Sequence, residues 1–244
     1  MIRMDEVAAV QRLAGPYELE LSRDEIGRLA HFLDLLDAAN RRMNLTRIVE
    51  RESAWSRHVL DSLALLAFVE AAGARNLIDI GSGGGLPGIP LAITMPELPI
   101  TLLEATGKKA RYLAETAEAL GLDHVTVIAE RAESLGTPEG GGRAAWDVVT
   151  ARAVGGLPVL LELSLPLLVE GGVLLAIKGQ RADEEIKASR KALKVLGGTV
   201  ELTHRTPSGT IVVVRRTGPM PRMYPRRPGE PARAPIGGIP REAR

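Results

Sequence analysis

The chain has 244 residues, of which 45% are hydrophobic and 25% charged, and a formal net charge of +1. This composition is typical of a globular protein, and the length suits one sizeable α/β domain with an extension. Cysteine is absent and the four histidines lie far apart, so the sequence excludes a disulfide framework and a thiolate nucleophile, and we expect no metal site.

Membrane and secretion signals are missing from the sequence. No apolar run reaches the length of about 18 residues that a membrane-spanning helix needs. The first ten residues contain Asp5 and Glu6 and lack the apolar core of a signal peptide. We therefore expect a cytoplasmic protein without a membrane segment, and since no pattern indicates an obligate interface, we expect a monomer.

Residues 1–75 are predicted to form an N-terminal helical extension. Ser22 followed by Glu25 is a capping-box pattern, and apolar residues follow it at helical spacing. A polar segment, NRRMNLTRI at 40–48, then leads to a second expected helix around 55–71.

Residues 76–217 alternate between short runs rich in Val, Ile or Leu and helical segments. This alternation predicts a Rossmann-like α/β domain with a mostly parallel, seven-stranded sheet and helices on both faces. Only a loop separates the last two strands, which indicates an antiparallel hairpin at the end. The expected strands are 77–80, 100–104, 124–128, 146–151, 173–177, 199–205 and 209–216, and the expected helices are 107–120, 157–169 and 181–195.

The segment 218–244 is predicted to be a basic tail. It contains six arginines, seven prolines and four glycines, against only two acidic residues. Because proline and glycine interrupt helices, we expect this tail to be irregular.

The loop after the first expected strand, GSGGG at 81–85, has four glycines in five residues. A tight turn needs fewer, so we expect the backbone to approach a ligand closely here. A Walker-type phosphate loop is excluded, because Ile89 stands where GxxxxGK[ST] requires lysine.

A dinucleotide site fits the same loop in part. The glycines have GxGxxG spacing, and Glu104 ends the next strand at a suitable distance. Pro87 and Pro90, however, shorten the helix that should bind a pyrophosphate, and Asp79 places a carboxylate beside it. An NAD(P)-dependent oxidoreductase stays as an alternative hypothesis.

S-adenosylmethionine (SAM) fits the loop without these two difficulties. SAM has no phosphate, and its ammonium and sulfonium groups favour an acidic residue such as Asp79 nearby. Glu104 can accept hydrogen bonds from both ribose hydroxyls. The residues therefore favour SAM over NAD, although Asp79 could equally cap the turn that follows the strand.

Charged residues also follow three later strands. Ligands of open α/β sheets bind beyond the carboxyl ends of the strands, so we expect Glu133, Arg152 and Lys178 around one crevice. His58 and Asp61 are interpreted instead as a buried polar pair that ties the N-terminal helices to the sheet.

Several motifs along the chain resemble those of one family. They are NLTRI, RHVLDSL, IDIGSGGGLPGIPLAI, RAES, DVVTARAV, AIKG and YPRRPGEPARAPI. With them the sequence closely resembles the bacterial 16S rRNA guanine-N7 methyltransferases, the glucose-inhibited division protein B family, over nearly its whole length. The glycine loop occurs in many methyltransferases, whereas NLT, RHVLDSL and YPRRPG are more specific.

The resemblance implies SAM as the methyl donor and N7 of a guanosine in the 530 loop of 16S rRNA as the acceptor. Relatives often have an aromatic residue where Leu86 stands, so a contact there would be purely apolar. The predicted cofactor-binding residues are Asp79, Gly81, Gly83, Leu86, Glu104, Ala105, Thr106, Ala132, Glu133 and Arg152.

Methylation at guanine N7 does not depend on proton transfer to a side chain of the protein. N7 presents a lone pair and no proton, so no general base is needed. The enzyme must hold N7 in line with the sulfonium methyl group and exclude water. Arg152 is the predicted catalytic residue, because a guanidinium suits either the SAM carboxylate or guanine O6.

RNA binding is expected from surface lysines and arginines, with 16S rRNA or the small ribosomal subunit as partner. Aromatic residues make up only 3% of the chain, so extensive base stacking is not expected. A non-catalytic RNA-binding protein that has kept the fold is a further alternative. The predicted RNA contacts are Lys108, Lys109, Arg111, Lys178, Arg222, Arg226 and Arg227.

Overall fold

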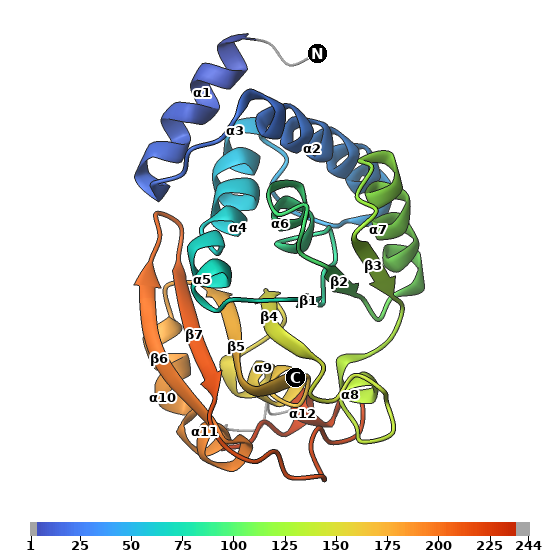
Figure 1. Ribbon diagram of the computed structural model, residues 1–244, viewed down its shortest axis with the longest axis vertical. Coiled ribbons are helices and arrows are strands. Elements are labelled where there is room, and N and C mark those ends of the chain that lie inside the picture. The colour runs from blue at the N-terminus through green and yellow to red at the C-terminus, as the bar shows by residue number, and fades with distance from the viewer. Residues whose placement is uncertain (1–3, 238–244) are drawn as a thin grey trace.

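The computed structural model describes residues 4–237, which form a seven-stranded sheet with helices on both faces (Figure 1). The strand order is β3-β2-β1-β4-β5-β7-β6, with β1 to β5 parallel and β7 antiparallel to both neighbours. This confirms the predicted fold class, including the antiparallel end hairpin. The strands are β1 (Leu77–Ile80), β2 (Ile100–Leu103), β3 (Val125–Ile128), β4 (Trp146–Arg152), β5 (Leu168–Lys178), β6 (Gly198–Arg205) and β7 (Thr210–Arg216).

The region before the sheet is helical, as predicted. The long helix α2 begins with the expected capping box, in which the Glu25 amide donates to Ser22 Oγ at 3.2 Å and the Ser22 amide donates to Glu25 Oε2 at 2.8 Å. The elements are α1 (Met4–Ala14), the 3₁₀ turn η1 (Gly15–Tyr17), α2 (Arg23–Met43), α3 (Arg51–Ala54), the π-helix η2 (Trp55–Leu60), α4 (Asp61–Leu63) and α5 (Leu66–Ala71).

Two helices between the strands differ from the prediction. The helix expected at 157–169 ends at Ser164, because Pro166 has no amide hydrogen to continue it and β5 begins at Leu168. The helix expected at 181–195 is divided at Ser189. The helices are α6 (Gly88–Thr94), α7 (Gly107–Ala119), α8 (Ala132–Leu135), α9 (Leu157–Ser164), α10 (Ala182–Ala188), α11 (Arg190–Leu196) and α12 (Glu230–Arg233).

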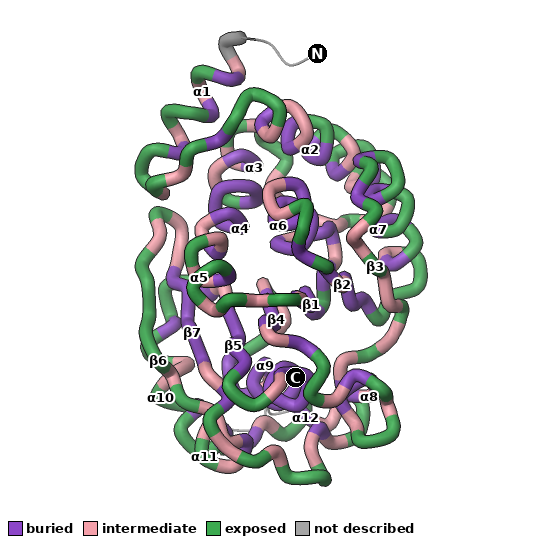
Figure 2. Tube along the Cα trace, viewed as in Figure 1, coloured by how far each residue is buried: buried purple, intermediate pink, exposed green. Residues whose placement is uncertain are grey.

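The sheet buries both of its faces, and neighbouring residues of a strand face opposite cores. Leu77 belongs to an apolar cluster with the N-terminal helices, α6 and α7, whereas Ile78 packs with α9 to α11. The two groups of helices lie on opposite sides of the central strands in Figure 1, and Figure 2 shows β5 and β7 mostly as buried. The first cluster is continuous from α1 to β7, so the extension shares its core with the sheet. The division into 1–75, 76–217 and 218–244 stays a prediction.

The tail is packed against the body of the protein as far as residue 237. Arg143 donates to the carbonyl oxygens of Met220, Pro221 and Tyr224 at 2.6 to 3.0 Å. The short helix α12 lies beside α9. Residues 238–244 of the predicted tail lie outside the described residues.

Within residues 4–237, no helix has both the length and the apolar character needed to cross a membrane.

Candidate functional site

The glycine loop after β1 needs glycine both for its conformation and for close packing. Gly81, Gly83 and Gly85 have φ angles of 66°, 53° and 89°, in the left-handed region that disfavours other residues. A Cβ on Gly81 would lie 2.9 Å from a methyl carbon of Val154. The loop then leads into α6, whose seven residues agree with the short helix that the prolines predicted.

Asp79 lies beneath this loop and not in a ligand crevice. Its side chain is completely buried; Thr150 Oγ1 donates to its Oδ1 at 3.0 Å and the Gly88 amide to its Oδ2 at 3.3 Å. Burial raises the pKa of this carboxyl to about 7. This burial and the bond from the Gly88 amide favour the alternative role of Asp79 as a cap, and its direct contact with the cofactor stays a prediction.

Glu104 joins the ends of β1 and β2. Its Oε2 accepts a hydrogen bond from the Gly83 amide at 3.0 Å, and its Oε1 accepts one from the Thr106 amide at 2.7 Å. A carboxylate oxygen can accept more than one hydrogen bond, so both oxygens keep capacity for a diol. The geometry therefore suits the predicted bonds to two ribose hydroxyls.

A crevice of about 290 Å³ opens where β1 to β4 end, close to the lower limit of about 300 Å³ for small-molecule pockets. Three glutamates and one arginine line it, Glu104, Glu130, Glu133 and Arg131, which favours a cationic ligand. Five of the predicted cofactor residues line the crevice: Gly81, Glu104, Ala105, Ala132 and Glu133. The other five do not line it: Asp79, Gly83, Leu86, Thr106 and Arg152.

The tail also contributes to this crevice, which the sequence analysis missed. Gly229, Pro231 and Ala232 line it opposite the strand ends, and Glu133 Oε1 accepts a hydrogen bond from the Gly229 amide at 2.9 Å. The signal was present in the motif YPRRPGEPA, which carried the family resemblance, but only its arginines were given a role, in RNA binding. Glu133 therefore holds the tail in place as well as lining the crevice.

Arg152 lies at the carboxyl end of β4 and is largely buried. Its Nη2 donates to Nδ1 of His58 at 3.0 Å, while its Nη1 is buried and has no partner in the described part of the chain. Burial lowers the pKa of Arg152 from its usual value, with Asp61 opposing that shift. A guanidinium with one unsatisfied end fits a site that binds an anionic or carbonyl oxygen.

His58 and Asp61 are both buried, as predicted, but they do not bond to each other. Asp61 accepts hydrogen bonds from Tyr17 Oη at 2.8 Å and from the hydroxyl of Ser208, which lies between β6 and β7. His58 reaches Arg152 instead. Each residue separately ties the N-terminal helices to the sheet, so the predicted role is correct and the predicted pairing is wrong.

The predicted RNA contacts divide into exposed and engaged residues. Lys178 is 8% exposed, and its Nζ donates to the Gly155 carbonyl and lies 2.7 Å from Glu185. Arg226 pairs with the buried Glu162 at 2.6 Å. Lys178 and Arg226 are therefore already paired within the protein, and their contact with RNA stays a prediction. Six of the predicted residues are at least partly exposed: Lys108, Lys109, Arg111, Arg222, Arg226 and Arg227.

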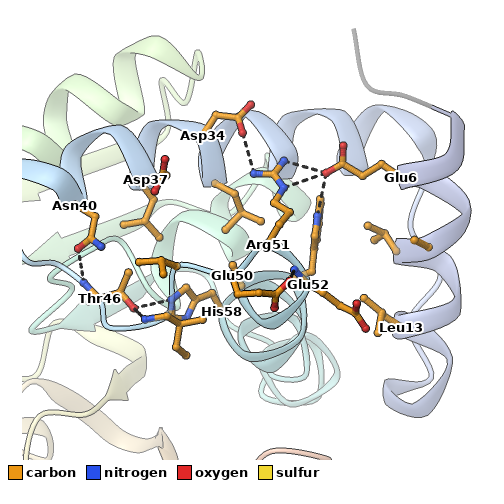
Figure 3. A pocket seen from close by; sticks show the side chains of 18 of the residues that line it. Glu6, Leu13, Asp34, Asp37, Asn40, Thr46, Glu50, Arg51, Glu52 and His58 are labelled. Atoms are coloured by element: carbon orange, nitrogen blue, oxygen red, sulfur yellow. Dashed lines mark hydrogen bonds and ion pairs between the residues drawn. The ribbon is translucent and has the colours of Figure 1, made fainter.

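A larger cavity of about 950 Å³ lies among α1, α2, α3 and η2 (Figure 3). Its central cation, Arg51, already pairs with Glu6 at 3.0 Å and with Asp34 at 2.8 Å. No predicted cofactor residue lines this cavity, although Thr46 and His58 form part of its wall. The predicted cofactor residues therefore make the smaller crevice at the strand ends the candidate site.

Comparison with known proteins gives one consistent family. The model of the family described as rRNA small subunit methyltransferase G matches residues 25–210. A ribosomal RNA small subunit methyltransferase G from Sorangium cellulosum is 48% identical over 204 residues, covering 83% of this chain and 84% of the relative. The protein of that name from Chloroflexus aggregans is 44% identical over 223 residues, covering 89% and 93%.

Solved structures agree on the fold. An O-methyltransferase from Bacillus cereus, crystallised in complex with SAH, superposes with a TM-score of 0.55 at 22% identity, covering 76% of this chain and 90% of its own. A putative O-methyltransferase from Klebsiella pneumoniae gives 0.53 at 20% identity, covering 77% and 90%. At these identities the likeness concerns the fold alone. The family model and the relatives together show that the chain belongs to the rRNA small subunit methyltransferase G family.

Proposed function

We propose that this chain transfers the methyl group of SAM to N7 of a guanosine in the 530 loop of 16S rRNA. Family membership supports methyl transfer to 16S rRNA. The observation that supports the choice of atom is that His58, the histidine next to Arg152, has both ring nitrogens in hydrogen bonds: Nδ1 accepts from Arg152, and Nε2 bonds to Thr46 Oγ1. Such a site suits an acceptor atom that carries no proton to be removed. Guanine N7 is such an atom.

Glu104 and Gly81 on the crevice wall, and Arg152 outside it at the end of β4, have distinct tasks in this proposal. Glu104 would accept the ribose hydroxyls of SAM, and Gly81 lets the backbone come close to it. Arg152 would use its free Nη1 for the SAM carboxylate or for guanine O6, which holds the reactants in line. SAM itself supplies an electrophilic methyl group.

Two alternatives are weaker on specific grounds. The NAD(P) oxidoreductase fits poorly, because the dinucleotide-binding sheet has strand order 3-2-1-4-5-6, whereas here the antiparallel β7 is inserted between β5 and β6. A non-catalytic RNA-binding protein would have the same fold as the enzyme. Only a measurement of methyl transfer from SAM distinguishes the two. The cytoplasmic location and the monomeric state stay predictions.

The test of this proposal is transfer of a labelled methyl group from SAM to unmodified small ribosomal subunits and to naked 16S rRNA. The labelled nucleotide is then located by the strand scission that 7-methylguanine permits. We expect label at a single guanosine of the 530 loop. Glu104→Gln is the matched variant, and it should bind SAM more weakly because the ribose loses a charged acceptor.

Other outcomes of this experiment would redirect the proposal. Label at another atom or another loop would refute the acceptor and keep the enzyme class. SAM binding without transfer to either substrate would favour the non-catalytic alternative. If SAM did not bind at all, the assignment of the crevice would be wrong.

The first turns of α7 are proposed as part of the RNA-binding surface. Lys108, Lys109 and Arg111 follow directly after the crevice residues at the end of β2. The slope of log affinity for rRNA against log salt concentration is negative, and each phosphate contact on a single strand contributes about −0.7 to it. Changing all three residues to glutamine should therefore make this slope less negative by about 2. SAM affinity should not change.

A matched control is available on the opposite face of the sheet. Lys187, Lys191 and Lys194 are exposed cations of α10 and α11, and changing them to glutamine removes the same charge. An equal loss of slope in both triple variants would mean that net charge, not a defined α7 surface, governs RNA binding.

A further inference from the structure

A row of three side chains connects the NLT motif to the end of β4. Thr46 lies in the segment between α2 and α3, His58 in the π-helix η2, and Arg152 at the end of β4. Thr46 Oγ1 lies 2.8 Å from His58 Nε2, and His58 Nδ1 lies 3.0 Å from Arg152 Nη2. Figure 3 shows the first of these bonds beside α2.

The chemistry of this row determines which nitrogen of His58 carries the proton. A guanidinium can only donate, so Nδ1 must be the acceptor of the bond to Arg152. In a neutral imidazole the proton is then on Nε2, which donates to Thr46 Oγ1. Burial, with Arg152 adding to it, lowers the pKa of His58 to about 4, which agrees with a neutral ring at neutral pH.

The far end of the row is itself fixed by backbone and side-chain bonds. The Thr46 amide donates to Asn40 Oδ1 at 2.8 Å, and the Ile48 amide donates to Thr46 Oγ1 at 3.0 Å (Figure 3). The ring of His58 is only 2% exposed, so packing restrains it as well. His58 therefore presents Nδ1 to Arg152 in one orientation.

This arrangement leaves one end of Arg152 for a ligand. His58 occupies Nη2, while the buried Nη1 has no partner among residues 4–237. We propose that His58 is a positioning residue: by accepting from Nη2, it holds the guanidinium so that Nη1 meets an oxygen of the bound reactants. This proposal rests on the proposed function, because it takes Arg152 to act on SAM or on the acceptor guanine.

The π-helix has a role in the same arrangement. The Asp61 amide bonds back five residues to the carbonyl of Ser56, which widens this turn of the helix. Such wide turns often occur at functional sites, because they reposition a side chain relative to a regular helix. Here the turn places His58 next to the end of β4.

The first test reads the tautomer of His58 directly and needs no catalytic activity. Nitrogen-15 spectra of histidine-labelled protein at neutral pH should show one ring, absent in His58→Phe, as the neutral form protonated at Nε2. The Nδ1 signal of this ring should shift in Arg152→Ala. A charged ring, or a ring protonated at Nδ1, would overturn the proposal whether or not the protein proves to methylate rRNA.

The second test separates positioning from simple packing. His58→Phe keeps an aromatic ring but removes the acceptor, and it should lower SAM affinity or the transfer rate about tenfold or more, since bonds to charged groups contribute about 1.5–3 kcal/mol. In an Arg152→Ala background the same change should have little further effect. Additive losses in the double variant would refute action through Arg152.

Two further variants serve as controls for folding and geometry. His124→Phe is the matched change at a histidine whose Nε2 bonds to the Ala92 carbonyl, and it should leave transfer unchanged. Thr46→Ser keeps the hydroxyl acceptor and should act as wild type, whereas Thr46→Val should weaken transfer. Equal activity of the Ser and Val variants would mean that Thr46 does not orient the ring.

Discussion

Replacing Arg152 with alanine is expected to lower the rate of methyl transfer about 10²–10³-fold, the usual cost of removing one oriented donor from a reacting centre. The expected effect is large because the guanidinium is already desolvated and has one free end, Nη1. Arg152→Lys should also be impaired, because a lysine cannot bond His58 and a ligand oxygen with a planar fork.

The fold should tolerate the loss of Arg152. The residue lacks a salt bridge among the described side chains, and removing its unsatisfied Nη1 relieves a desolvation cost that offsets the lost bond to His58. The melting temperature of Arg152→Ala should therefore stay close to that of the wild type, measured beside single-turnover transfer rates. Arg75→Ala is a suitable control, because Arg75 pairs with Asp147 and its side chain is 82% exposed. Transfer by Arg152→Ala at half the wild-type rate or more would refute the catalytic role.

Replacing Glu162 with glutamine is expected to lower the free energy of unfolding by about 3 kcal/mol, the lower end of the range for breaking a buried ion pair. Glu162 is completely buried in α9 and accepts from the backbone amide, Nε and Nη2 of Arg226 at 2.6 to 2.9 Å. The lower end applies because the Arg226 side chain keeps 20% exposure to water.

The same change should loosen the tail and the crevice that it lines. Gly229, Pro231 and Ala232 lie on the crevice wall, and Arg226, shortly before them in the chain, is bound to Glu162 of α9. Urea denaturation should show the loss of stability, and trypsin should cleave more rapidly after Arg226 and in the segment that follows. Arg227→Ala, at an exposed neighbour, is the control. Unchanged stability together with unchanged cleavage would show that the ion pair does not hold the tail.

The sequence predicted the parts of the site that depend on local spacing. The predicted family, the fold, a SAM-dependent methyltransferase and its action on 16S rRNA are confirmed. Glycines in the left-handed region and a carboxylate at the end of the next strand are both readable from short motifs. The position of Glu104 beside the glycine loop could therefore be predicted, since it follows from the register of two adjacent parallel strands, while its contact with the cofactor stays a prediction.

Partners of buried charges could not be found in this way. Asp79 was expected to face a ligand, but Thr150, 71 residues away, occupies it from the neighbouring strand β4. Lys178 and Arg226 looked like free surface cations in the sequence. In the folded chain Lys178 pairs with Glu185 on α10, and Arg226 pairs with Glu162 on α9.

By itself, then, the sequence determined the periodicity of the elements, the glycine loop and the family, because these are properties of residues close together in the chain. Only the tertiary structure decided which charged groups are satisfied within the protein and which stay free for a ligand. His58 and Arg152 are 94 residues apart, and no spacing rule relates them. Burial makes such pairs matter, since a charge without a partner in the interior is costly. Nη1 of Arg152 is one of four buried side-chain atoms that have no hydrogen-bond partner among residues 4–237, and of these four it belongs to a predicted site residue.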